Sequence, residues 1–227
     1  MKADALDNPI WNSLTTTHQP YCLNLEGFRF YHPEYCPFGA LGHEDFNTDV
    51  LLAYANLAHD FFIVGDRPTT HPKDLQLKNE LVCNQMVLNN SISFDHKEEI
   101  VLLNGTYQQD LIALVNLVQP GYFKHKTPDL GNYYGIFKND ELVAVTGERM
   151  KMPQATEISA VVTHPEHSGK GYAKQLVAFV ANQIVQEGKL PFLHVAEKNT
   201  GAIALYEKLG FVTRRKISFW NYGKAAI

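Results

Sequence analysis

The stretch that decides the fold runs from Glu157 to Ala173 and reads Glu-Ile-Ser-Ala-Val-Val-Thr-His-Pro-Glu-His-Ser-Gly-Lys-Gly-Tyr-Ala. Its first part has the apolar composition of a buried strand, and a long helical pattern begins at its end. The glycine-rich loop between them lets backbone N–H groups approach an anion, and the helix dipole favours negative charge there. The stretch therefore predicts a strand, a loop and a helix N-terminus that bind a phosphate.

The loop does not match two common phosphate-binding motifs. A Walker-type loop needs Ser or Thr directly after its Gly-Lys pair, and here Lys170 is followed by Gly171. A dinucleotide fingerprint needs a third glycine and a terminal acid in a clean βαβ unit, and both are missing. A lone glycine loop is weak evidence, so the identity of the ligand depends on the rest of the chain.

Hydrophobic periodicity around the loop predicts a mixed α/β domain. Apolar residues from Ala173 to Val185 recur at helical spacing, and Gly188 is suited to end that helix. A further helix capped by Asn199 ends at Gly210. The expected strands cover residues 99–104, 133–137, 142–146, 156–163, 190–195 and 211–220, with another helix over 106–118. The strands 133–137 and 142–146 are expected to form a hairpin that turns at Asn139-Asp140. This alternation predicts a mixed sheet covered by helices.

The first part of the chain has weaker patterns. Strand-like alternation runs from Leu23 to Tyr31, a helical pattern runs from Asp49 to His59, and prolines break the remainder into short pieces. We expect an N-terminal α/β region over residues 1–95 and a second domain over residues 96–227. The boundary falls in the polar stretch 89–97.

Composition and charge narrow the function. The formal net charge of the 227 residues is −4 and the basic residues form no blocks, which argues against a nucleic-acid partner. No apolar run approaches the roughly 20 residues of a membrane helix, and three cysteines without metal spacing favour reduced thiols in a cytoplasm. The segment His43-Glu44-Asp45 lacks the paired histidines of a helical zinc site, so we expect no metal.

Two segments together resemble one family. Ser168-Gly-Lys-Gly-Tyr-Ala173, after its strand, is similar to the acyl-CoA loop of the GNAT superfamily of N-acyltransferases. The segment Asn199 to Phe211 resembles the last helix of that family and its Gly-Phe exit. The resemblance covers residues 99–222, and for residues 1–95 a degenerate GNAT-like half is one interpretation. Ser168 departs from the Gln or Arg that usually begins the family loop, so a side-chain contact there is in doubt.

Shorter segments resemble a subgroup that includes glycine N-acyltransferase-like proteins. These segments are residues 120–123, 157–160, 191–195 and 206–211. The resemblance implies a GNAT fold of mixed α/β type with an additional N-terminal α/β half. It also implies acetyl-CoA as co-substrate, bound mainly by backbone groups. The implied residues are Ala160, Val161, Val162 and Thr163 for the pantetheine arm, Ser168, Gly169, Lys170, Gly171, Tyr172 and Ala173 for the pyrophosphate, and Asn199 for the CoA arm.

The resemblance also implies catalytic roles. Tyr206 is expected to be the general acid for the departing thiolate, and the alternative is a packing residue on the apolar helix face. An amine acceptor arrives mostly protonated, since a lysine-like amine has a pKa of about 10.4. Glu157 is the first candidate for the general base, Glu148 the second and His194 the third. The three cysteines lie outside the resembling region, so no cysteine nucleophile is expected.

The sequence therefore predicts a cytoplasmic N-acetyltransferase, monomeric or homodimeric, in which a small-molecule or peptide amine attacks acetyl-CoA directly. Two alternatives stay open. One is a non-catalytic acyl-CoA-binding or sensing protein, and the other is an acyltransferase that uses a longer acyl-CoA with an amino-acid acceptor. The N-terminal aromatic side chains either cover one side of the acceptor cleft or form a core; they are Trp11, Tyr21, Phe28, Phe30, Tyr31 and Tyr35.

Overall fold

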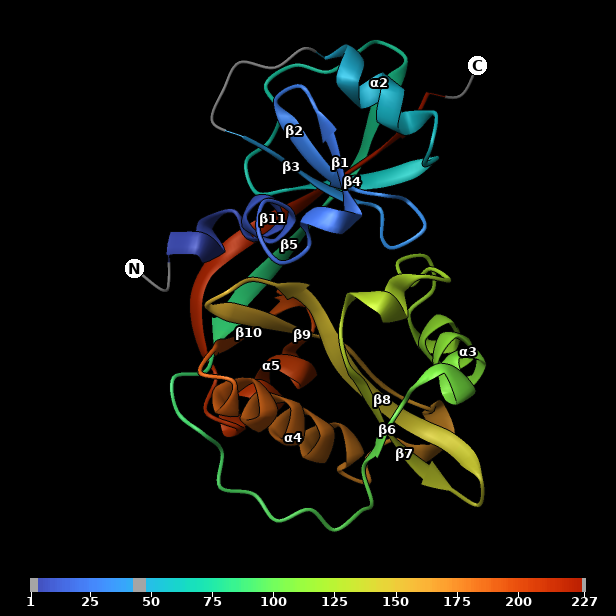
Figure 1. Ribbon diagram of the computed structural model, residues 1–227, viewed down its shortest axis with the longest axis vertical. Helices are drawn as coiled ribbons and strands as arrows, with labels where there is room; N and C mark the ends of the chain where they lie inside the picture. Colours follow the sequence, from blue (N-terminus) through green and yellow to red (C-terminus); the bar gives the residue numbers. More distant parts are fainter. Residues whose placement is uncertain (1–3, 43–47, 226–227) are drawn as a thin grey trace.

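The computed structural model describes residues 4–42 and 48–225, which form an eleven-stranded mixed sheet with helices packed on it (Figure 1). The strands are β1 (Cys22–Leu25), β2 (Phe28–Tyr31), β3 (Phe38–Leu41), β4 (Asp60–Val64), β5 (Leu75–Val87), β6 (Val101–Leu102), β7 (Tyr133–Lys138), β8 (Glu141–Lys151), β9 (Ala155–Thr163), β10 (Leu190–Ala196) and β11 (Val212–Lys224). The helices are α1 (Pro9–Leu14), α2 (Asp49–Ala55), α3 (Gln108–Val118), α4 (Tyr172–Gln186) and α5 (Thr200–Lys208). The predicted mixed α/β class is confirmed.

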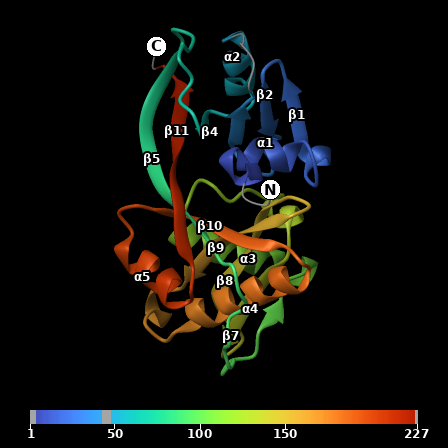
Figure 2. The same ribbon diagram turned by 90° about the vertical axis from the view of Figure 1, so that its left-hand side faces the viewer.

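Two long strands join the two ends of the molecule. The strand order is β1-β2-β3-β4-β11-β5-β10-β9-β8-β7-β6. Strands β5 and β11 pair antiparallel along their length, and Figure 2 shows them side by side from the N-terminal part of the protein into the C-terminal part. At one end β11 pairs with β4, and at the other β5 pairs with β10. The sheet is therefore continuous across the predicted boundary near residue 95, and the division into two domains stays a prediction.

Helices cover both faces of the C-terminal part of the sheet. On one face Val177, Val180 and Ile184 of α4 pack with apolar residues of β5, β9 and β10. On the opposite face Leu111 and Leu114 of α3 pack with residues of β7, β8 and β9. The period-3.6 apolar pattern of each helix is what buries one side of it against the sheet. Strand β9 is consequently held from both sides, which fixes the strand that leads into the glycine loop.

Turn residues account for the local boundaries. Asn139 and Asp140 have φ values of 50° and 64°, which is the conformation of a tight two-residue hairpin turn between β7 and β8. Helix α4 ends at Gly188, whose φ of 73° lies in the left-handed region that favours glycine. The predicted hairpin and the predicted end of this helix are both confirmed.

The N-terminal part differs from its prediction in two ways. The stretch from Leu23 to Tyr31 forms a hairpin of β1 and β2 rather than one strand. The aromatic side chains of Phe28, Phe30 and Tyr31 are fully buried in apolar clusters, so they form a core and do not line an acceptor cleft. The N-terminal part instead contributes Phe38 to the wall of a cavity between β9 and β10, here called the central cavity.

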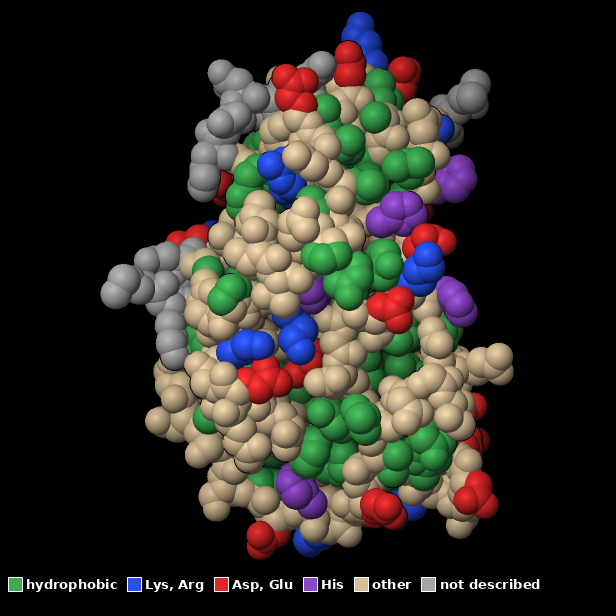
Figure 3. All heavy atoms as spheres, viewed as in Figure 1, with side chains coloured by type: hydrophobic (Ala, Val, Ile, Leu, Met, Phe, Trp, Pro, Cys, Tyr) green, Lys and Arg blue, Asp and Glu red, His purple; other side chains and the backbone are tan. Residues whose placement is uncertain are grey.

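No helix in the described ranges is long and apolar enough to cross a membrane. Lysine, arginine and acidic side chains are interspersed on the face drawn in Figure 3. Within residues 4–42 and 48–225, no group of three or more His, Cys, Asp or Glu is placed to hold a metal ion. His43, Glu44 and Asp45 lie outside the described residues.

Candidate active site

A gap between two parallel strands forms the centre of the site. Strands β9 and β10 pair only from Leu190 with Ala155 to Phe192 with Glu157, and they have no paired residues beyond that point. The edge of β9 that follows Glu157 therefore leaves backbone donors and acceptors without a partner strand. A cavity of about 510 Å³ is lined by residues 158–161 of β9 and 194–196 of β10.

An irregularity in β9 widens this gap. Val145 of β8 pairs with Val162 and Gly147 pairs with Ser159, so two residues of β9 lie opposite Thr146. One of the two is Ala160, whose φ of 51° is unusual for a residue with a side chain. This arrangement is a β-bulge, which bends the strand and redirects its backbone groups. Bulges of this kind are common beside binding sites.

The glycine loop lies at the N-terminus of α4, as predicted. Gly169 and Gly171 have φ values of 76° and 80°, and no other atom lies within 4 Å of the position where a Cβ would stand on either. In the described part of the chain, no acceptor pairs with the backbone N–H groups of residues 169–173. The loop is exposed, and the Nζ atom of Lys170 lies 3.3 Å from Nδ1 of His167. These free donors at a helix N-terminus suit a phosphate group.

Helix α5 contributes two predicted residues to the cavity. The side-chain oxygen of Asn199 accepts a hydrogen bond of 3.1 Å from the N–H of Ala202, so Asn199 caps the helix while lining the cavity. Its amide nitrogen remains available as a donor. Tyr206 also lines the cavity, with 6% of its surface exposed. Its hydroxyl makes no hydrogen bond within residues 4–42 and 48–225, so it is free to act on a ligand.

Burial changes the acidity of Tyr206. Desolvation raises the pKa of its hydroxyl to about 12, which keeps the group protonated throughout the neutral range. A thiol has an ordinary pKa of about 8.5. Full proton transfer from Tyr206 to a thiolate is therefore uphill by roughly 5 kcal/mol, at 1.36 kcal/mol per pKa unit. Tyr206 is better suited to donate a hydrogen bond to a departing thiolate than to give up its proton completely.

Glu157 lies at the floor of the same cavity in a dense set of donors. Its Oε1 atom is 2.7 Å from Nη2 of Arg149 and 2.8 Å from Nδ1 of His194. Its Oε2 atom accepts from Nε of Arg149 at 2.8 Å and from the N–H of Met150 at 3.4 Å. The carboxylate is 1% exposed, and each of its oxygens already has two donors.

The donors around Glu157 determine its basicity. Burial alone would raise the pKa of this carboxyl, but the charge of Arg149 and the hydrogen bonds from His194 and Arg149 outweigh burial and lower the pKa to about 2. A carboxylate with so low a pKa is a weak base. The predicted base role of Glu157 is untested, and this environment weighs against it. The second candidate, Glu148, does not line the cavity; it accepts from the N–H of Asn132 and from Lys151.

Gln85 determines the tautomer of His194. Arg214 can only donate, and its Nη1 atom lies 2.9 Å from Oε1 of Gln85, so the amide nitrogen of Gln85 faces the other way. That nitrogen donates to the carbonyl of Leu6 at 2.8 Å and lies 3.1 Å from Nε2 of His194. Nε2 of His194 is thus the acceptor and Nδ1 carries the proton given to Glu157. The histidine serves to hold Glu157, and its one lone pair is already occupied.

One cysteine lies nearer the site than expected. Cys83 of β5 lines the cavity, although it is far from the glycine loop in sequence. Burial raises the pKa of its thiol to about 12, so it stays protonated at neutral pH. The position of Cys83 is a correction to the sequence prediction, but its chemistry still disfavours a cysteine nucleophile.

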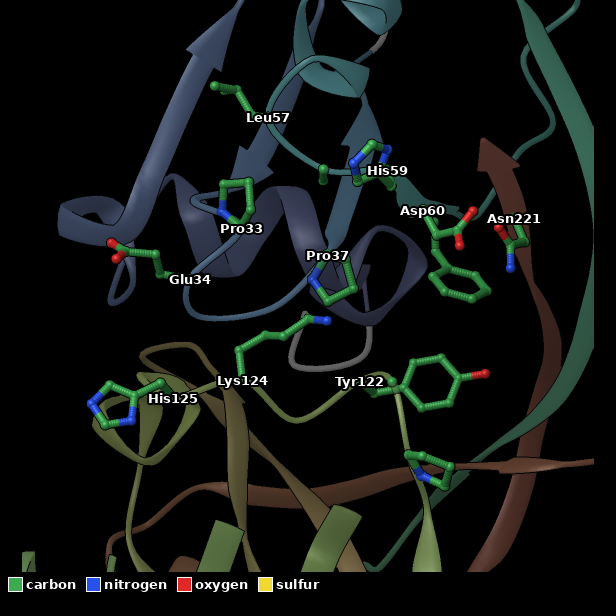
Figure 4. Close-up of a pocket in the computed structure, with 14 residues that line it drawn as sticks. Pro33, Glu34, Pro37, Leu57, His59, Asp60, Tyr122, Lys124, His125 and Asn221 are labelled. Atoms are coloured by element: carbon green, nitrogen blue, oxygen red, sulfur yellow. The ribbon is translucent and has the colours of Figure 1, made fainter. Parts of the chain in front are cut away.

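A second cavity of about 610 Å³ adjoins the first, and Pro120 and Tyr122 line both. Figure 4 shows its labelled side chains, with Lys124 between Glu34 at one end and Asp60 at the other. It lies between the N-terminal part and the segment that follows α3. An acceptor could therefore reach the central cavity past Tyr122.

The structure places part of the predicted site in the wall of the central cavity, whereas Thr163 and residues 168–172 are outside its lining. Tyr206, Asn199, Glu157, Ala173 and Val161 line the central cavity, whereas the side chain of Val162 packs in the α3 core and would contribute only its backbone. Sequence reasoning missed other lining residues, namely Arg149, Tyr133, Phe38 and Cys83. The signal available for Arg149 was a Glu148-Arg149 pair after the apolar run 142–145 of one strand.

Comparisons with known proteins agree with this geometry. Residues 133–220 match the FR47-like protein family. A 60-residue segment is 42% identical to a mycothiol acetyltransferase of Kocuria rhizophila, and covers 26% of this chain and 20% of that relative. The chain thus spans only a fifth of the length of this curated relative.

Solved structures give broader matches. A GCN5-related N-acetyltransferase-like protein from Streptococcus suis has a TM-score of 0.66 at 14% identity, with 98% of this chain and 97% of that chain covered, which shows the fold alone. An acetyltransferase structure of the GNAT family from Novosphingobium aromaticivorans has a TM-score of 0.87 and 31% identity, and the match covers 97% of this chain and 99% of that chain. With this identity over the length of both proteins, the chain belongs to the GNAT family of acetyltransferases.

Proposed function

We propose that this protein moves the acetyl group of acetyl-CoA to a primary amine by direct attack, without a covalent enzyme intermediate. The observation that carries the proposal is one cavity lined by the open edge of β9, by Ala173 in the first turn of α4 and by Tyr206. The free N–H groups of residues 169–173 suit the pyrophosphate of CoA, and the unpaired edge of β9 suits the amide groups of the pantetheine arm.

In the proposed reaction the amine nitrogen attacks the thioester carbonyl carbon, and the carbon–sulfur bond then breaks. The departing thiolate receives a hydrogen bond from Tyr206, and the thiol is completed by a proton from solvent. A hydrogen bond to a charged group contributes about 1.5–3 kcal/mol. Tyr206 is therefore proposed to contribute on the order of tenfold to a hundredfold in rate.

For the amine, the proposal assigns no strong enzyme base. Glu157 is ionised but weakly basic, and its oxygens are occupied by Arg149, His194 and Met150. The amine is therefore proposed to attack in its neutral form, after losing a proton to water, and the nitrogen gives a second proton to water as the carbon–sulfur bond breaks, which leaves the neutral amide. Glu157 is proposed to hold Arg149 in place. A base role for Glu157 would instead place a limb of the pH–rate profile at a pKa independent of the acceptor.

The experiment measures two quantities in the same protein, CoA affinity by calorimetry and free thiol release from acetyl-CoA with a panel of amines. Substitution of Tyr206 by Phe should reduce turnover and leave CoA affinity unchanged. Tyr107→Phe is a matched control, because Tyr107 packs on Phe137 outside the cavity. CoA binding without amine-dependent thiol release in the wild type would favour the alternative of a non-catalytic acyl-CoA-binding protein.

The finer donor preference is also a proposal. Acetyl-CoA is the donor expected of a GNAT acetyltransferase, and the subgroup resemblance keeps a longer acyl-CoA with an amino-acid acceptor as the alternative. The two donor classes are separated by letting acetyl-CoA and longer acyl-CoA thioesters compete for the same site, with the thermal unfolding midpoint of the protein as the readout. Residues 1–95 are proposed to be a degenerate GNAT-like half that contributes Phe38, Leu81 and Cys83 to the cavity wall.

A further inference from the structure

We infer that the acceptor is an amine that also carries a carboxylate, and that Arg149 binds this carboxylate. The inference rests on the proposed acetyl transfer and deepens it by naming the acceptor class. Its starting point is the unequal use of the guanidinium donors of Arg149. Glu157 takes one edge of the group, through Nε and Nη2, at 2.8 and 2.7 Å.

The opposite edge of Arg149 is free. A guanidinium has five N–H donors in a rigid fork and can pair with two carboxylates on two different edges. In the described part of the chain, three N–H groups of Arg149, two on Nη1 and one on Nη2, have no acceptor. The side chain is 15% exposed and lines the central cavity. A second carboxylate can therefore pair end-on with Nη1 and Nη2.

The surroundings hold Arg149 rigid and charged. The guanidinium carbon lies 4.8 Å from the centre of the Phe38 ring, so an aromatic face supports it from the N-terminal part. Burial would lower the pKa of Arg149, but the Glu157 carboxylate outweighs burial and raises it. A fork that is fixed and permanently charged loses little freedom when a ligand binds.

Tyr133 supplies an independent observation in the same cavity. Its hydroxyl is buried and has no hydrogen-bond partner in the described residues, although buried polar groups are nearly always paired. Tyr133 lines the cavity with Arg149 and is 2% exposed. A bound carboxylate has more acceptor sites than one fork uses, so the hydroxyl can donate to it. The orphaned hydroxyl and the free fork belong to residues that line the same cavity, and the inference assigns both to one carboxylate.

The adjoining cavity has the same charge preference. Its two acidic side chains, Glu34 and Asp60, are already paired with Lys126 and Lys78. The Nζ atom of Lys124 lines this cavity and has no acidic partner among the described residues. The unpaired charge on the path to Arg149 is therefore positive. This charge attracts the carboxylate of the inferred acceptor and disfavours a purely cationic amine.

The test compares acceptors that share a side chain and carry either a carboxylate or a carboxamide, with kcat/KM expressed per neutral amine because the amide has the less basic amino group. Thiol release from acetyl-CoA is measured with the common L-amino acids and glycine, and with the corresponding amino-acid amides. In the wild type at least one amino acid should exceed its amide in kcat/KM by tenfold to a hundredfold, the range of a charged hydrogen-bonded pair. Arg149→Lys, which keeps the charge and removes the fork, should reduce this ratio about tenfold.

Further variants separate recognition from folding. Tyr133→Phe removes only the hydroxyl and should lower the ratio severalfold, with the thermal midpoint unchanged. The double variant R149M/E157Q removes both charges of the pair at once, so it leaves no unpaired buried charge. It should bring the ratio of kcat/KM for the amino acid to that for its amide down to about one. Arg215→Lys is the matched control, since Arg215 pairs with Asp7 outside the cavity.

The outcomes are distinguishable. Equal or better reaction of the amides in the wild type, or a ratio unchanged in both Arg149→Lys and R149M/E157Q, overturns the carboxylate anchor and leaves acetyl transfer intact. Acetyl-CoA binding without thiol release from any amine overturns the proposed function, and the carboxylate anchor falls with it.

Discussion

Replacement of Glu157 by Gln gives the sharpest physical prediction. The carboxylate is buried and its pKa is lowered from an ordinary 4.5 to about 2, chiefly because Arg149 and His194 outweigh the effect of burial. At 1.36 kcal/mol per pKa unit, this difference corresponds to roughly 3 kcal/mol of stability at pH 7. The variant should therefore have a free energy of unfolding about 3 kcal/mol below that of the wild type at pH 7.

The sign of the pH dependence follows from the same two pKa values. A carboxyl whose pKa is lowered in the folded state contributes its full stability above the unfolded pKa of about 4.5, and loses it as the pH falls towards about 2. The deficit of Glu157→Gln should therefore be full at pH 7 and only about 1 kcal/mol at pH 3.

Urea unfolding followed by tryptophan fluorescence at both pH values measures this deficit. Glu166→Gln is the control, because Glu166 is exposed and makes no ion pair in the described residues. A deficit below about 0.5 kcal/mol at pH 7, or one that does not shrink with falling pH, would refute the reasoning.

Four further predictions follow from single features. Tyr206→Phe should lower kcat about tenfold to a hundredfold with CoA affinity unchanged by calorimetry, and an unaffected kcat would exclude the hydroxyl from the reaction. Gly171 has a φ of 80°, so Gly171→Ala should lose about 1–2 kcal/mol of stability and bind CoA more weakly. Gly201→Ala should show neither effect when both variants are compared by thermal unfolding and CoA titration. Burial lowers the pKa of His18 to about 4, so protonation of this group should lower the free energy of unfolding of the wild type by roughly 3 kcal/mol between pH 6.5 and 4. Urea unfolding of His18→Gln should show a smaller decrease over the same pH range. The limb of log kcat/KM that rises with pH should move with the pKa of the acceptor when amines of different pKa are compared, because the neutral amine attacks; a rising limb that stays fixed would indicate an enzyme base.

Local pattern was enough to predict the C-terminal part of the fold. The hairpin at Asn139 and Asp140, the helix that follows Gly171 and the cap at Asn199 each depend on a few neighbouring residues, and each is confirmed. The pairing of β9 with β10 stops at Phe192, which leaves the backbone of β9 open next to the residues that the family resemblance implies for the pantetheine arm.

Contacts between distant segments could not be predicted in the same way. Strand β5 lies between β10 and β11, an arrangement determined by long-range pairing rather than by its own sequence. Cys83 and Phe38 therefore reach the cavity from segments that show no catalytic motif. The interpretation of Glu157 as a base was reasonable from alternation alone, but its acidity depends on Arg149 and His194, whose partners only the register reveals.

The central claim is that the cavity between β9 and β10 transfers an acetyl group from acetyl-CoA to an amine. The most direct measurement incubates the protein with isotope-labelled acetyl-CoA and the amine panel, and follows both CoA release and labelled N-acetyl product. Equal amounts of CoA and N-acetyl product, lost together in Tyr206→Phe, are the expected result. Tight binding of acetyl-CoA without labelled N-acetyl product from any amine would contradict the claim.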